Sequence, residues 1–178
     1  MTYRILLPIF IITVTLSQVE AHAPESEPAA NGETLVRDEA VYFFAPGPVM
    51  GFYYFEYQKA LSERHSVNIA LEYANFKYKG DDLLRLWGIY RYKLGENGKG
   101  PLEGLFLTPA IQFARSIDGR SSIINSLIYL SWQNVHNNGF SIQYFAGAGY
   151  GIPMVKSERY TMYTGFSPSL GVSMGYTF

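Results

Sequence analysis

The stretch SPSLGVSMGYTF (residues 167–178), which ends the sequence, alternates large apolar side chains with small or hydroxylated ones. A repeat of two residues places alternate side chains on opposite faces of a β-strand. The bulky face carries Leu170, Val172, Met174, Tyr176 and Phe178. The stretch therefore predicts a strand with one face against an apolar environment and the other in a crowded or wet space.

The composition excludes several classes of protein. At 178 residues the chain predicts one domain, and its net charge of -1 gives no basic field for binding nucleic acid. It has no cysteine, so it forms no disulfide, no thiolate metal site and no cysteine-linked lipid anchor. Its three histidines are scattered in the sequence, and we expect no metal site and no cofactor. Its 15 Tyr, 12 Phe and 17 Gly are typical of strands with one crowded face and one interfacial face.

The N-terminal residues have the pattern of a secretory signal peptide. Arg4 precedes twelve uncharged residues, and Val19 and Ala21 fit the small positions of a cleavage site. We expect a cleaved signal peptide at residues 1–21, while a buried hydrophobic strand is the alternative. Residues 22–38 are rich in Pro, Ala and Glu without a period, which predicts a short disordered lead-in in the periplasm.

Short alternating segments separated by turn residues follow from residue 39 to the end. They number eight if the Pro-Gly-Pro break at 46–48 is a turn, and seven if residues 39–60 form one bent strand. The face opposite the bulky one is mostly Gly, Ala, Ser, Asn, Gln and Thr, whereas a soluble β-sandwich carries frequent charges there. We predict an all-β fold, an antiparallel up-and-down transmembrane β-barrel of eight strands over 39–178. The soluble sandwich remains the alternative.

A few charged residues occupy the predicted interior face: Glu56, Glu72, Arg85, Arg91 and Lys93. With a turn at 80–82, Glu72 is expected opposite Arg91 or one pair away, and Glu56 next to Glu72. Arg85 and Lys93 would then lie one pleat further along. Buried charges must be paired or hydrated, so the cluster is either a structural plug of salt bridges or an ion-selective constriction.

The alternating strands, the signal-peptide pattern and LGVSMGYTF at 170–178 together resemble the small outer-membrane β-barrel proteins of the OmpA membrane domain, OmpX and NspA class. The resemblance implies a location in the outer membrane of a Gram-negative envelope. It also implies that Phe178 and the alternating residues before it are a signal read by the barrel-assembly machinery. Lipid and lipopolysaccharide would be the surroundings, and we expect a monomer.

Some barrels of this size are enzymes that act on lipid A, so residues that could serve as a catalytic nucleophile or base have to be considered. In RHSVN (64–68), His65 and Ser66 are adjacent and would point to opposite faces of a strand. The similar lipid A deacylase has His-x-Ser-Asn, and this chain is out of step by one residue. His136 lies among Asn and Gly, which is typical of a turn. We therefore assign no catalytic residue.

The sequence favours a non-enzymatic barrel with an envelope-structural or surface-interaction role. A narrow, porin-like channel for small or apolar solutes is the first alternative, because Gly147, Gly149, Gly151, Gly171 and Gly175 would line the lumen with little bulk. A lipid A-modifying enzyme is the second. The segment 153–165 is the longest predicted external loop and the best candidate for a surface contact.

Overall fold

The computed structural model describes residues 37–44, 51–76, 81–96, 100–155 and 164–178. The predicted signal peptide, the lead-in up to residue 36, the break at 46–48 and most of the predicted external loop lie outside these residues. The described part of the chain contains no helix of the length and apolar character needed to cross a membrane.

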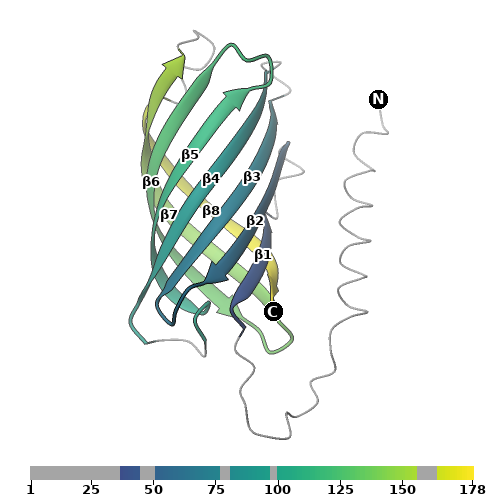
Figure 1. Ribbon diagram of the computed structural model, residues 1–178, viewed down its shortest axis with the longest axis vertical. Coiled ribbons are helices and arrows are strands. Elements are labelled where there is room, and N and C mark those ends of the chain that lie inside the picture. Colours follow the sequence, from purple (N-terminus) through teal and green to yellow (C-terminus); the bar gives the residue numbers. More distant parts are fainter. Residues whose placement is uncertain (1–36, 45–50, 77–80, 97–99, 156–163) are drawn as a thin grey trace, which may run out of the picture. The chain divides into compact units, whose positions relative to one another are not determined.

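Eight antiparallel strands close into a barrel in which each strand pairs with the next and the last returns to the first (Figure 1). Residues 39–60 form two strands, so the eight-strand prediction is confirmed. The strands are β1 (Glu39–Phe44), β2 (Phe52–Ala60), β3 (His65–Phe76), β4 (Asp81–Leu94), β5 (Gly104–Ser116), β6 (Ser122–Val135), β7 (Phe140–Val155) and β8 (Gly165–Thr177).

The predicted assignment of side chains to the two faces is confirmed. Along β3, Val67, Ile69 and Leu71 are exposed on the outer face, whereas the residues between them are buried inside. Along β6, where apolar residues occur on both faces, Ile123 and Tyr129 are buried inside and Ile128 is exposed on the outer face. The interior is therefore mainly polar and the exterior mainly apolar.

Aromatic rings of the neighbouring strand occupy the space beside three inward-facing glycines. Tyr42 lies opposite Gly175, Tyr129 opposite Gly147, and Phe145 opposite Gly171. A Cβ built on each of these glycines would meet the facing side chain at 2.4–2.8 Å. The small residues on which the alternative of a narrow channel rested thus make room for rings, because an eight-stranded barrel is only wide enough for packed side chains.

The barrel has two ends, the Phe178 end and the Asp118 end. The Phe178 end contains Phe178 and the hairpins 61–64 and 136–139, and the Asp118 end contains the hairpin 117–121. At the Phe178 end, Glu39 and Phe178 exchange backbone hydrogen bonds of 3.1 and 2.8 Å, which close the sheet. Lys59 bridges the carboxylates of Asp38 (2.9 Å) and Glu39 (2.6 Å), and its hydrogen bond lowers the pKa of Asp38.

Candidate functional site

The interior of the barrel holds the predicted charges, but in separate groups. Glu72 and Arg85 face each other across β3 and β4 and form a salt bridge of 2.5 Å. The indole Nε1–H of Trp87, on β4, donates to the other oxygen of Glu72 at 3.2 Å. Glu72 is buried and Arg85 largely so, and their pairing offsets the cost of removing both charges from water.

The predicted pairing of Glu72 with Arg91 is wrong. The loop between β3 and β4 comes before Asp81, so β4 begins earlier than the predicted turn allowed. This register places Arg85 opposite Glu72 and Ser66 opposite Arg91. A shift in the position of the turn changes the cross-strand partner of every residue in the two strands. The alternation of side chains along one strand does not indicate where the turn lies.

Glu56 is an acid without a salt-bridge partner among the described residues. It is buried on β2 and accepts hydrogen bonds from the Tyr54 hydroxyl and the Asn68 amide. It lies opposite Ala70, one inward position away from Glu72. The two carboxylates are therefore diagonal neighbours on adjacent strands, but no shared guanidinium joins them.

A second group crosses the lumen nearer the Phe178 end. The fully buried Arg91 of β4 donates to the side chains of Gln133 and Ser131 on β6, the latter at 3.1 Å. Gln133 donates in turn to the Tyr42 hydroxyl of β1 at 2.5 Å. Because β1, β4 and β6 are not neighbours in the sheet, these bonds span the interior. We call Tyr42, Arg91, Ser131 and Gln133 the cross-lumen network.

Two further contacts fill this side of the barrel. The Arg91 guanidinium lies 4.1 Å from the centre of the Phe106 ring, a cation–π distance. Leu102 comes from the segment between β4 and β5, is 1% exposed, and packs against Ala40 and Tyr42. Lys93, the remaining predicted interior charge, donates to the carbonyl oxygen of Gly100 at 2.7 Å and so holds this segment in place. Leu102 and the cross-lumen network together obstruct the Phe178 side.

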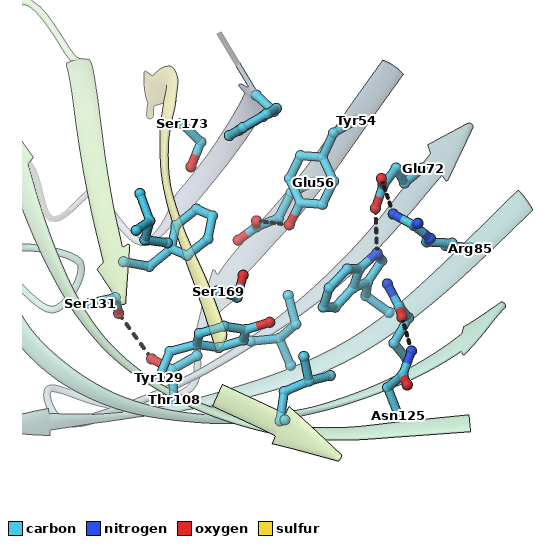
Figure 2. A pocket seen from close by; sticks show the side chains of 18 of the residues that line it. Tyr54, Glu56, Glu72, Arg85, Thr108, Asn125, Tyr129, Ser131, Ser169 and Ser173 are labelled. Atoms are coloured by element: carbon cyan, nitrogen blue, oxygen red, sulfur yellow. Dashed lines mark hydrogen bonds and ion pairs between the residues drawn. The ribbon is translucent and has the colours of Figure 1, made fainter. Parts of the chain in front are cut away.

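On the other side of the cross-lumen network the interior opens into a cavity of about 380 Å³. Figure 2 shows Tyr54, Glu72 and Tyr129 turned toward this space, with Arg85 beyond Glu72. The polar groups of its wall are largely bonded to one another: Glu72 with Arg85, Asn125 with Gln112, and Thr108 with Ser131 at 2.9 Å. Apolar wall comes from residues that include Ile89, Leu127 and Phe145.

The histidine candidates lie away from the cavity. His65 is on the outer face, hydrogen-bonded to the Tyr90 hydroxyl and 5.3 Å from the Tyr92 ring. Ser66 points inward and accepts a 3.0 Å bond from Gln58, so the two adjacent side chains do not pair. His136 lies in the hairpin before β7 and stacks on Phe140. No group of three or more metal-ligating side chains occurs in the described ranges.

The predicted assembly-signal residues share the outer face of β8. Leu170, Met174 and Phe178 are exposed, and Val172 and Tyr176 are partly buried.

Several interior residues were not singled out from the sequence, notably Tyr42, Trp87 and Gln133. Their inward positions follow from alternation. The sequence signal that could have identified them is a large side chain among small inward-facing residues. Their bonds across the lumen were not accessible, since these depend on how the sheet closes.

The chain was compared with family models, curated proteins and solved structures, and none of the three comparisons gave a match.

Proposed function

We propose that this protein is a bacterial outer-membrane β-barrel, exported through its N-terminal signal peptide, with a structural or surface-interaction role in the envelope. Its partners would be the outer-membrane lipids, lipopolysaccharide and, during biogenesis, the barrel-assembly machinery. In this proposal the barrel acts as a monomer without enzymatic activity, and it is closed to ions.

One observation supports the membrane location above all: each of the eight strands exposes large apolar or aromatic side chains on the outer face. Examples from distant strands are Phe55 (47% exposed), Ile111 (62%) and Leu170 (84%). Water-soluble monomers rarely expose contiguous apolar patches beyond a few hundred Å². A band that encircles the molecule is suited to hydrocarbon, which also requires the closed hydrogen bonding of a barrel.

On β7, two tyrosines flank small residues of the outer face, and aromatic residues take such positions in membrane barrels. On β7, Tyr144 and Tyr150 bracket Ala146 and Ala148 on the outer face. The positions of these two tyrosines support the proposal that β7 crosses the membrane, because tyrosine rings favour the interface between lipid and water.

Replacing an outward isoleucine with lysine tests the location. Ile69 lies in the middle of β3 and is 66% exposed, while Leu61 lies in a hairpin beyond the strands and is 63% exposed. In a membrane, Ile69→Lys should lower the free energy of unfolding by about 2–4 kcal/mol, since a lysine near the bilayer midplane is costly. Leu61→Lys should change it by less than about 1 kcal/mol, because cost falls toward the interface.

The measurement is urea unfolding of the protein refolded into phosphatidylcholine vesicles, combined with flotation of the vesicles. If Ile69→Lys is as harmless as Leu61→Lys, and the protein stays in the aqueous fraction, the outer face is wet and the proposal is wrong.

A further inference from the structure

The wall of the cavity includes residues of both faces of β8. Ser169 and Ser173 point inward, whereas Pro168 and Leu170 belong to the exposed outer face, yet all four line the same cavity. Leu170 is 84% exposed, which is the highest exposure among the large apolar residues of the described chain. The cavity is therefore continuous with the outer surface at this strand.

The described residues nearest this opening belong to β1, β2 and β8. β1 ends at Phe44, which pairs with Ser173 of β8. Phe44 and Phe52, at the ends of β1 and β2 nearest this region, also line the cavity. The described residues around the opening are therefore largely apolar: Phe44, Phe52, Pro168 and Leu170.

The chemistry of the wall favours an apolar occupant. Arg85 neutralises Glu72, and the amides of Gln112 and Asn125 bond to each other, so these groups offer few sites to a charged solute. Other polar groups of the wall include Glu56, whose carboxylate accepts hydrogen bonds from Tyr54 and Asn68, and Gln143, whose Oε1 is buried without a hydrogen-bond partner. A volume of about 380 Å³ falls in the range of about 300–1,000 Å³ that is usual for small-molecule sites.

We propose that this cavity binds an acyl chain of a membrane lipid, which enters past Pro168 and Leu170 of β8. The inference rests on the proposed membrane location. The chain would pack against Phe145, Leu127 and the ring of Tyr129, while the cross-lumen network forms the floor and keeps the lumen closed on the Phe178 side.

The protein contains two tryptophans, and they report on the two environments separately. Trp87 lines the cavity, whereas Trp132 is 40% exposed on the outer face of β6. Trp132→Phe leaves only the interior reporter, and Trp87→Phe leaves only the exterior one. Each variant is refolded into phosphatidylcholine vesicles with and without bromine on the acyl chains, because bromine quenches tryptophan emission on contact.

We expect brominated lipid to quench both reporters to a comparable extent. Ser169→Phe, which fills the cavity, should abolish the quenching of Trp87 when it is combined with Trp132→Phe. The matched Ser126→Phe, on the exposed outer face of β6, should leave that quenching intact. Quenching through the barrel wall would survive Ser169→Phe, so this comparison isolates entry of the chain.

Three results would overturn the inference, and they have different meanings. In the first, brominated lipid quenches Trp132 but not Trp87, or it quenches Trp87 equally with and without Ser169→Phe. Either finding would show a membrane barrel whose cavity takes no lipid. Quenching of Trp87 by aqueous iodide but not by brominated lipid would assign the cavity to water-soluble ligands. No quenching of Trp132 would refute the membrane location itself. If Ser169→Phe fails to refold, Ser173→Phe provides a second filling variant.

Discussion

At the scale of single residues, glycine sets how closely neighbouring strands and rings approach inside this barrel. Gly175 allows the Tyr42 ring and the backbone of Val41 to lie against β8, and a Cβ there would be 1.8 Å from the Val41 carbonyl oxygen. Such a contact cannot be relieved by rotating a side chain. The backbone of β1 or β8 would have to shift at the seam that closes the sheet.

We therefore expect Gly175→Ala to destabilise the barrel by at least about 1–3 kcal/mol, the usual cost of overpacking. Gly88→Ala is the matched control, because Gly88 is also in a strand but its Cβ would meet nothing within 4 Å. Urea unfolding and the gel mobility of unboiled samples in detergent both report the difference. Equal stability of the two variants would mean that β1 and β8 are not held at this distance.

At the scale of elements, the outer face of β8 carries the predicted assembly signal while its backbone closes the barrel. The Phe178 side chain is 50% exposed, whereas its backbone exchanges two hydrogen bonds with Glu39. Phe178→Ala keeps those bonds, so we expect its free energy of unfolding after refolding in vitro to stay within about 0.5 kcal/mol of the original. In cells, we expect a marked loss of folded protein in the outer membrane.

Phe113→Ala is the control for that prediction, since Phe113 is 39% exposed on the outer face of β5 and far from the chain end. The two variants are compared by the fraction of heat-modifiable protein in isolated membranes. Equal levels would refute a special role of Phe178 in assembly.

The strands and their faces were predictable because alternation is a local property: Val67, Ile69 and Leu71 alternate with inward residues whatever their partners are. The register was not. Glu72 meets Arg85 rather than Arg91 because the loop lies earlier than the glycine and aspartates at 80–82 suggested. The same limit applied to the lumen, where Gly147 and Gly171 indicated small bulk but could not reveal that Tyr129 and Phe145 lie over them.

At the scale of the whole molecule, the barrel has an obstructed side and a hollow side. The cross-lumen network and Leu102 fill the Phe178 side, and the cavity lies toward the Asp118 end. The predicted charge cluster is thus divided: Arg91 and Lys93 belong to the obstruction, while Glu56, Glu72 and Arg85 line the cavity. Arg91 fits the interpretation of a structural plug, but it is held by neutral partners and not by a salt bridge. Its side-chain hydrogen bonds in the described chain go to Gln133 and Ser131.

This division predicts the electrical behaviour of the protein. In planar bilayers the unmodified protein should give no discrete conductance steps, because eight strands enclose little more than packed side chains. Combining Arg91→Ala with Leu102→Gly removes the guanidinium from the cross-lumen network and the side chain of Leu102 while leaving the backbone ladder unchanged, so water should enter the Phe178 side and small, resolvable steps should appear. Gln112→Ala combined with Asn125→Ala removes comparable polar groups from the cavity and should remain silent. Steps from the unmodified protein would favour a channel, and silence from the Arg91 and Leu102 variant would place the barrier elsewhere in the barrel.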